Sequence, residues 1–252
     1  MTIRHPRLLG ALSALVVLSL AAAMGQAAWR IKQAAELARQ SEPLQASPAG
    51  ATASLLIAGD STAVGTGATS AASSVAGLIA RDHPCLRIVN RATDGAHFAD
   101  IARQLEGDER FDVVLVLGGG NDVIRLTAQD ALAQGSATVA QRAAARAPLV
   151  VIMPPGNVGN APFFMAPLSW LMARRSRTLH GLVRQAAADH GALYVSLYKD
   201  KADDPFAQRP DALNARDGLH PSDAGYRLWY EALNAQAGLA GRLAALTGRK
   251  GN

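Results

Sequence analysis

Four short blocks of polar and glycine residues occur in a fixed order along the sequence. They are Gly59-Asp60-Ser61, a glycine turn ending at Gly95, Gly120-Asn121-Asp122, and Asp217-Gly218-Leu219-His220. Together they supply a serine hydroxyl, neutral hydrogen-bond donors and an acid–base pair, which are the groups that acyl transfer through a serine requires. One block alone would be weak support, whereas four in this order indicate a catalytic site.

Ser61 is the candidate nucleophile. Gly59 tolerates backbone angles that other residues resist, and Asp60 can accept backbone hydrogen bonds that brace a sharp turn. A serine in such a turn projects its hydroxyl above the edge of a sheet, but the hydroxyl is a poor nucleophile until a base takes its proton. The alternative interpretation of this block is an ordinary strand-to-helix loop, in which Ser and Asp are common.

His220 is the candidate base. A neutral imidazole can take the serine proton at physiological pH, and Asp217, three residues earlier, can fix its tautomer. His97 follows Asp94 by the same spacing, so spacing alone does not exclude it as the base. A metal site would need a further ligand close by, for which Asp223 is the one candidate in the block.

The intermediate of acyl transfer carries a negatively charged oxygen that needs hydrogen-bond donors aimed at it in advance. We expect three donors: the backbone amides of Ser61 and Gly95, and the side-chain NH₂ of Asn121. Asp122 is expected to hold its loop rather than to react. The run Gly118-Gly119-Gly120 fits a backbone close to a substrate, although a flexible turn after a strand would have the same composition.

Alternating apolar and helical segments predict the scaffold that positions these blocks. Five apolar runs read as strands buried on both faces, at 54–58, 86–90, 113–117, 149–153 and 192–197. Helices are predicted at 71–81, 98–105, 131–146, 168–190 and 222–237, the last with Ser222 as N-cap and Gly238 as its end. This alternation predicts a parallel sheet with right-handed crossovers, in which ligands bind beyond the carboxyl ends of the strands. Ser61, Gly95 and Asn121 follow the first three strands.

The blocks resemble those of the SGNH hydrolases, also called the GDSL esterase/lipase family. The resemblance covers about residues 54–230 and departs from the first motif at Thr62, where the family has Leu. It implies a flavodoxin-like three-layer α/β/α sandwich with a parallel five-stranded sheet, and hydrolysis of carboxylic esters without metal or cofactor. It also implies Ser61, Asp217 and His220 as catalytic triad, with Ser61, Gly95 and Asn121 as oxyanion hole. The resemblance therefore favours His220 over His97.

The N-terminal region predicts export. Arg4 and Arg7 precede an uncharged stretch from Leu8 to Trp29, which fits either a signal peptide or a membrane anchor; a buried core helix is the competing interpretation. We assign residues 1–28 to this leader or anchor, 29–50 to a short helix and a linker, and 51–252 to the hydrolase domain. Both export interpretations place the domain in the periplasm or otherwise outside the cytoplasm, anchored to the inner membrane in one of them.

Composition limits the partners. The net charge of +5 and the 5% of aromatic residues, with no basic run interleaved with aromatics, argue against nucleic acid. The single cysteine, Cys85, cannot form an internal disulfide, and we expect it to be a small buried residue at a strand start. The oligomeric state is not indicated.

The expected substrates are esters of short or medium acyl chains, or lysophospholipid-like esters. The apolar segment 154–172 could form an acyl pocket or lid, pack the next helix, or dip into a membrane surface. Acetylated carbohydrate is less favoured, because no aromatic-rich platform for sugar is evident. The alternatives are a flavodoxin-like FMN-binding protein, with the Thr- and Gly-rich loop 62–69 on the phosphate, and an inactive membrane-tethered binding module. FMN binding would leave the pairing of Asp217 with His220 unexplained, and the intact set of five catalytic positions argues against an inactive module.

Overall fold

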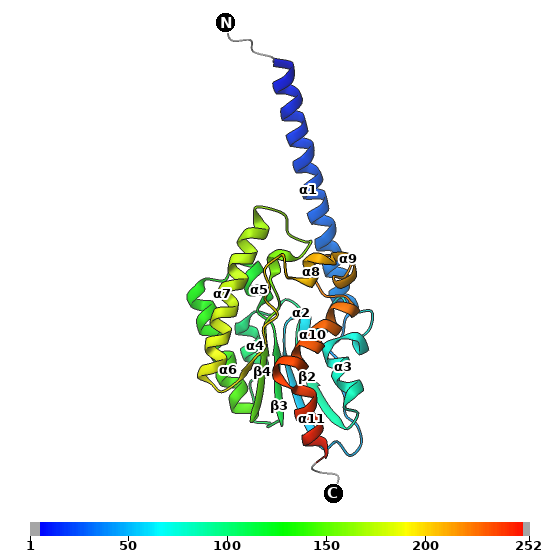
Figure 1. The fold of residues 1–252 in the computed structure, drawn as a ribbon, viewed down its shortest axis with the longest axis vertical. Helices are drawn as coiled ribbons and strands as arrows, with labels where there is room; N and C mark the ends of the chain where they lie inside the picture. The colour runs from blue at the N-terminus through cyan, green and yellow to red at the C-terminus, as the bar shows by residue number, and fades with distance from the viewer. Residues whose placement is uncertain (1–5, 249–252) are drawn as a thin grey trace.

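A parallel β-sheet lies between two layers of helices in the computed structural model, which describes residues 6–248 (Figure 1). Its strands are β1 (Ala53–Gly59), β2 (Leu86–Asn90), β3 (Val113–Leu117), β4 (Leu149–Met153) and β5 (Leu193–Tyr194). They lie in the order β2-β1-β3-β4-β5, and every neighbouring pair is parallel. This is the flavodoxin-like strand order. The predicted three-layer α/β/α sandwich with a parallel five-stranded sheet is therefore confirmed.

The sheet is covered on both faces because its strands are apolar on both faces. In β1, Leu55 and Ile57 point into one core cluster, whereas Leu56 and Ala58 point into the other. The first cluster is closed by α3 (Val75–Asp82), α10 (Asp223–Ala237) and α11 (Leu239–Gly248). The second is closed by α4 (Phe98–Gln104), α6 (Gln129–Arg146) and α7 (Leu168–Asp189).

Short helices lie beyond the carboxyl ends of the strands. They are α2 (Ser61–Val64), η1 (Ala71–Ser73), α5 (Gly120–Ile124), η2 (Val158–Asn160), α8 (Pro205–Gln208) and α9 (Pro210–Leu213). Two of them directly follow strands that carry the polar blocks: α2 follows β1, and α5 follows β3. This end of the sheet is where the predicted site residues gather.

Three local predictions are wrong. The last strand is shorter than 192–197, because after Val195 the chain leaves β4 and the backbone of Ser196 pairs with the side chain of Gln236 instead. The helix predicted at 71–81 is divided at Ser74, whose hydroxyl accepts from the Gly77 amide and caps α3. Cys85 is exposed rather than buried, because it lies in the turn that precedes β2 and not in the strand.

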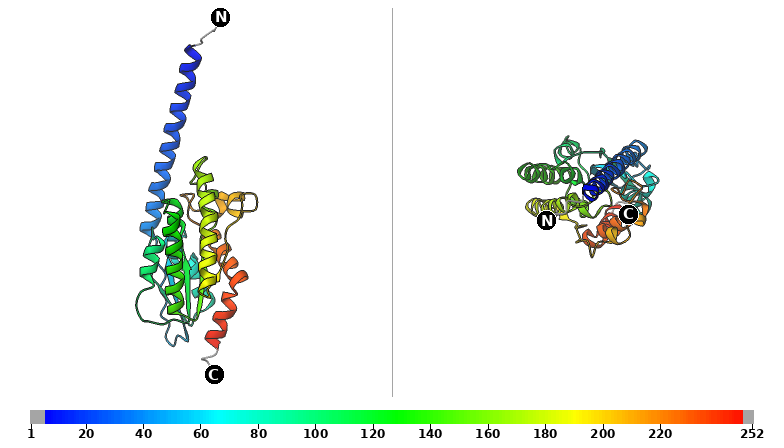
Figure 2. Two further views of the ribbon diagram at one scale, coloured as in Figure 1. Left: turned by 90° about the vertical axis from the view of Figure 1, so that its left-hand side faces the viewer. Right: turned by 90° about the horizontal axis from the view of Figure 1, so that it is seen from above.

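The N-terminal region is one long helix, α1 (Pro6–Gln40), which extends from the body (Figures 1 and 2). It includes the short helix expected after Trp29, whereas Arg4 lies outside the described residues. Among the residues that the structure describes, none of the helices combines the length and apolarity needed to cross a bilayer.

The segment 41–50, which has the composition of a linker, is held against the sheet. Ala46 forms an antiparallel bridge with Ile88 of β2, through hydrogen bonds of 3.1 and 2.8 Å. The Gln45 side chain donates to the backbone oxygen of Asn90 and accepts from its amide, at 2.7 and 3.0 Å. These contacts fix the C-terminal end of α1 relative to the sheet.

Candidate active site

Ser61 lies at a tight turn between β1 and α2. A Cβ atom at Gly59 would lie 2.0 Å from the Leu117 carbonyl oxygen, so only glycine allows β1 to end this close to β3. Asp60 is the N-cap of α2, and its carboxylate accepts from the amide and the hydroxyl of Thr62 at 2.9 and 2.7 Å. Ser61 is consequently the first residue of α2, at the carboxyl end of the sheet.

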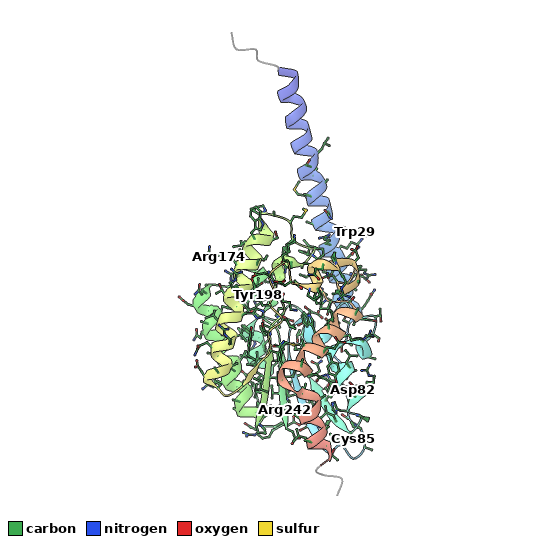
Figure 3. The ribbon with its side chains drawn as sticks, in the orientation of Figure 1. Trp29, Asp82, Cys85, Arg174, Tyr198 and Arg242 are labelled. Carbon is green, nitrogen blue, oxygen red and sulfur yellow. The ribbon has the colours of Figure 1, made fainter. Side chains whose placement is uncertain are left out.

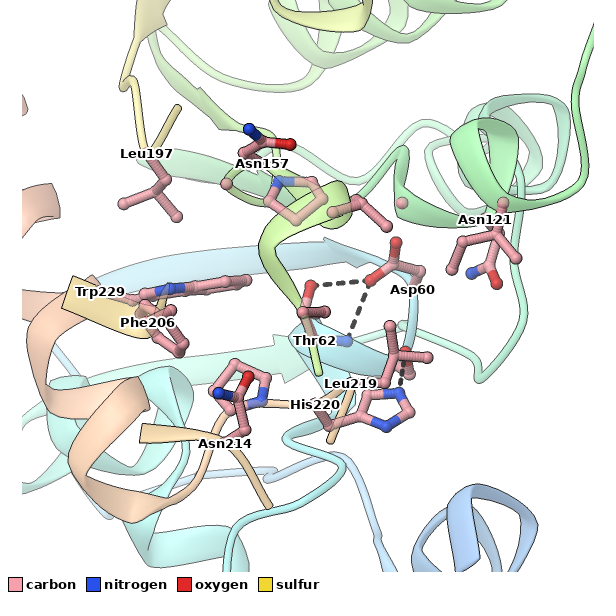
Figure 4. A pocket seen from close by; sticks show the side chains of 18 of the residues that line it. Asp60, Thr62, Asn121, Asn157, Leu197, Phe206, Asn214, Leu219, His220 and Trp229 are labelled. Atoms are coloured by element: carbon pink, nitrogen blue, oxygen red, sulfur yellow. Dashed lines mark hydrogen bonds between the residues drawn. The ribbon is translucent and has the colours of Figure 1, made fainter. Parts of the chain in front are cut away.

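The Asp60 carboxyl is buried beneath this turn. Burial raises its pKa above the ordinary value, and the hydrogen bonds from Thr62 offset only part of that effect. In Figure 4, Asp60 lies beside Thr62, with which it forms both hydrogen bonds. The buried Asp60 carboxylate therefore stabilises the turn that contains Ser61.

His220 connects Ser61 with Asp217. Its Nε2 lies 2.9 Å from Ser61 Oγ, and its Nδ1 lies 2.5 Å from Asp217 Oδ2. With the proton on Nδ1, the imidazole donates to the carboxylate and leaves Nε2 free to accept from the serine hydroxyl. The structure therefore brings Ser61, at the start of α2, together with the Asp217 and His220 side chains, although Ser61 and His220 are 159 positions apart in sequence.

Asp217 is fully buried and orients the imidazole. Burial by itself would raise the pKa of its carboxyl, but the hydrogen bond from His220, the electrostatic attraction of a protonated imidazole at that position and two backbone amides together lower the pKa below the ordinary value. Those amides belong to Leu219 and His220, and they donate to Asp217 Oδ1 at 3.0 and 3.1 Å. The carboxylate thus stays ionised although no water reaches it.

Three hydrogen-bond donors border the cleft beside Ser61. Gly95 adopts φ +77°, a left-handed conformation that favours glycine. Among the described residues, neither the Ser61 amide nor the Gly95 amide donates to a protein acceptor. Asn121 donates one N–H of its side-chain amide to the Ala96 carbonyl oxygen at 3.1 Å, which holds the group in place and leaves the second N–H for a ligand. All three residues line the same cleft as His220.

The competing residues are engaged elsewhere. His97 caps α4, and its Nδ1 lies 3.4 Å from Asp122, which also accepts from the Phe98 amide. Asp94 accepts from the hydroxyl of Thr66 at 2.6 Å rather than pairing with His97. The expected role of Asp122 in holding its loop agrees with these contacts.

Within the described part of the chain, no metal cluster surrounds His220. The Asp223 carboxylate accepts hydrogen bonds from the backbone amide and the hydroxyl of Thr69, at 2.8 and 2.6 Å. Across residues 6–248, no three His, Cys, Asp or Glu side chains are grouped closely enough to hold a metal ion.

A cleft of about 570 Å³ surrounds Ser61 and His220. One side is apolar and includes Leu197, Phe206 and Trp229, which Figure 4 shows on the opposite side of His220 from Asn121. Another wall comes from α1 and consists of Ile31, Ala34, Ala35 and Ala38. Sequence reasoning missed both walls, because no motif marks these residues and they meet only through tertiary packing.

The apolar segment 154–172 divides into two parts. Its first part lines the cleft, through Pro155, Val158 and Ala161. Phe163 and Phe164 pack edge to face at 4.9 Å, and neither lines the cleft. The segment therefore supplies only part of the lining of the cleft.

The chain resembles known proteins both in sequence and in fold. Residues 57–228, more than half of the chain, match the GDSL-like lipase/acylhydrolase family. An α/β-hydrolase enzyme from the metagenome of Lake Arreo, Spain, is 24% identical with a TM-score of 0.59, over 75% of this chain and 96% of that chain. An acetylxylan esterase from Geobacillus stearothermophilus is 21% identical with a TM-score of 0.54, over 75% and 95%. A lipase/acylhydrolase from Enterococcus faecalis is 19% identical with a TM-score of 0.53, over 75% and 96%.

At these identities the solved structures show a shared fold. No curated protein matches the sequence.

Proposed function

The chain belongs to the GDSL-like lipase/acylhydrolase family and is an ester hydrolase, and on that premise we propose that it cleaves carboxylic esters through Ser61, His220 and Asp217. The observation that carries this proposal is the hydrogen-bonded series Ser61 Oγ, His220 Nε2, His220 Nδ1 and Asp217 Oδ2, at 2.9 and 2.5 Å. Each atom has the partner that serine catalysis requires.

In the acylation step, Ser61 Oγ attacks the ester carbonyl carbon while His220 Nε2 takes the hydroxyl proton. The carbonyl oxygen becomes negatively charged and is stabilised by the amides of Ser61 and Gly95 and by the free N–H of Asn121. Collapse of this intermediate breaks the bond to the alcohol, which leaves with the proton from His220. The product is an acyl ester of Ser61.

In the deacylation step, His220 takes a proton from water, and the hydroxide attacks the acyl carbon. The same three donors stabilise the second intermediate, which releases the carboxylic acid and returns the proton to Ser61. Asp217 stays ionised throughout, and its negative charge stabilises the imidazolium that forms beside it.

The substrates that we propose are esters with a short or medium acyl chain, or lysophospholipid-like esters. The cleft volume of about 570 Å³ is within the range of ligand sites and exceeds what an acetyl group needs. The apolar wall of Leu197, Phe206 and Trp229 supports an acyl chain on that side of Ser61. Export from the cytoplasm, with the N-terminal segment as leader or membrane anchor, is part of this proposal.

A series of p-nitrophenyl esters tests the proposal. We expect the wild type to hydrolyse the butanoate to decanoate esters, and Ser61→Ala and His220→Ala to lose turnover while circular dichroism shows an unchanged fold. Full activity in folded Ser61→Ala would refute the nucleophile. Cleavage of acetate alone would point to acetylated substrates, and a yellow chromophore in inactive protein would favour FMN binding.

A further inference from the structure

The exposed large apolar side chains gather at one end of the molecule. They lie on α1, just after α5 and around the start of α7, at the end from which α1 extends (Figures 1 and 2). Among the described residues they are Leu18, Met24, Trp29, Ile31, Leu126, Met165, Leu168, Trp170 and Leu171. Single exposed apolar residues are ordinary, but a concentration of them marks a surface that binds a partner.

The densest part of this surface is the segment Met165–Leu171, which we call the α7 tip. Within it the exposed fractions are 50% for Met165, 45% for Leu168, 71% for Trp170 and 40% for Leu171. Figure 1 shows the start of α7 rising above the sheet toward the same side as α1. No other part of the described chain covers these side chains, although their burial would be favourable.

Arginines continue the exposed face of the α7 tip. Arg174 and Arg177 follow Trp170 by four and seven residues, so they lie on the same side of the helix. Both are exposed, and Arg174 has no acceptor among the described residues. Arg177 is paired with the exposed Asp200 at 2.9 Å, whereas Arg175 turns inward and donates to the carbonyl oxygen of Thr127. An apolar tip bordered by free positive charge complements the surface of an anionic lipid bilayer.

The surface of α1 repeats this arrangement. Trp29 is 59% exposed and is followed by Arg30 and Lys32. Tryptophan and basic residues are typical of the boundary between a membrane and water. In Figure 3, Trp29 and Arg174 lie toward the end from which α1 extends, and Cys85 lies toward the opposite end.

The catalytic cleft lies between α1 and the segment that leads to the α7 tip. Ile31 of α1 and Ala161 of that segment both line it. The Phe163 amide donates to the Gly218 carbonyl oxygen at 2.9 Å, which ties the segment to the loop of His220. A partner bound to the α7 tip and to Trp29 would therefore lie next to the cleft.

We propose that the α7 tip and the exposed side chains of Trp29 and Ile31 bind the surface of an anionic lipid bilayer. The tip inserts its apolar side chains among the lipids, and Arg174 contacts the negatively charged headgroups. The cleft then faces the bilayer. This inference concerns binding and does not depend on the ester chemistry.

The single cysteine provides a matched control for the test. Cys85 is exposed, so the full-length protein can be labelled there with an environment-sensitive nitrobenzoxadiazole dye. A second protein, Cys85→Ser with Leu168→Cys, carries the same dye on the α7 tip. Each is mixed with vesicles of phosphatidylcholine, with or without phosphatidylglycerol, and circular dichroism verifies that both are folded.

We expect the dye at position 168 to brighten and shift to shorter wavelength with vesicles that contain phosphatidylglycerol, while the dye at Cys85 stays unchanged. Adding Arg174→Gln should raise the anionic lipid needed for half of the change roughly fivefold, because each basic residue near a charged surface contributes about that factor. No change at position 168, or an equal change at Cys85, would overturn the proposal in favour of a protein partner or no partner. An equal response to neutral vesicles would overturn the role of Arg174.

Discussion

A buried histidine outside the site should make this protein sensitive to acid. His180 of α7 bridges two elements of the sheet edge: its Nε2–H donates to the Pro155 carbonyl oxygen at 2.7 Å, and its Nδ1 accepts from the Tyr194 hydroxyl at 2.5 Å. Burial lowers its pKa to about 4, and the hydrogen bond to Pro155 opposes only part of that shift. The folded protein therefore holds this imidazole neutral.

The size of the effect follows from linkage. The pKa of His180 falls from 6.5 in the unfolded chain to about 4 in the folded one, so between these two pH values the unfolded chain binds a proton that the folded protein does not. Stability is therefore complete above pH 6.5 and is lost as the pH falls. The loss is about 2 kcal/mol at pH 5 and approaches about 3 kcal/mol well below pH 4.

Urea unfolding of the wild type and of His180→Gln at pH 8 and pH 5 isolates this contribution. Other groups titrate equally in both proteins, so their effects cancel in the difference between the two free energies of unfolding. We expect the advantage of the wild type to shrink by about 2 kcal/mol between pH 8 and pH 5. A constant difference between the two proteins would refute the reasoning.

Three further substitutions test the cleft. Asn121→Ala should lower kcat roughly 10²–10³-fold in steady-state kinetics, since it removes a donor to the oxyanion; a change confined to KM would contradict that role. Asp217→Asn should lower kcat by about 10⁴ because the wrong tautomer of His220 is favoured, and near-normal turnover would remove Asp217 from the mechanism. Ala232→Phe, which fills the cleft from α10, should lower kcat/KM for octanoate by at least about tenfold while acetate is spared. Equal losses for both esters would argue against an acyl chain on this side.

The strands could be predicted where a run of mostly apolar residues lies in the sheet along its whole length. The runs 86–90, 113–117 and 149–153 coincide with β2, β3 and β4, because apolar residues predominate in all three runs. The last strand was predicted too long because an apolar run continues past Tyr194. In the structure the backbone of Ser196 forms hydrogen bonds with the Gln236 side chain and not with β4. Such a contact from a distant helix leaves no local signal.

The same distinction holds for the site. Ser61, Gly95 and Asn121 could be proposed because each follows a predicted strand. His220 could be proposed because it follows Asp217 by three residues, although only the resemblance to the SGNH hydrolases favoured it over His97. The α1 wall, with Ile31 and Ala34, and the apolar wall of Phe206 and Trp229 could not be found. These residues are ordinary helix and loop residues in sequence, and they acquire a role only when distant elements pack together.

The proposed ester hydrolysis depends most directly on an activated serine at position 61. Labelling the full-length protein with a fluorophosphonate, followed by mass spectrometry of its peptides, tests this claim. We predict that the label attaches to Ser61 in the wild type and that folded Ser61→Ala remains unlabelled. Labelling of another serine, or no labelling of folded wild type, would contradict the assignment of Ser61 as nucleophile.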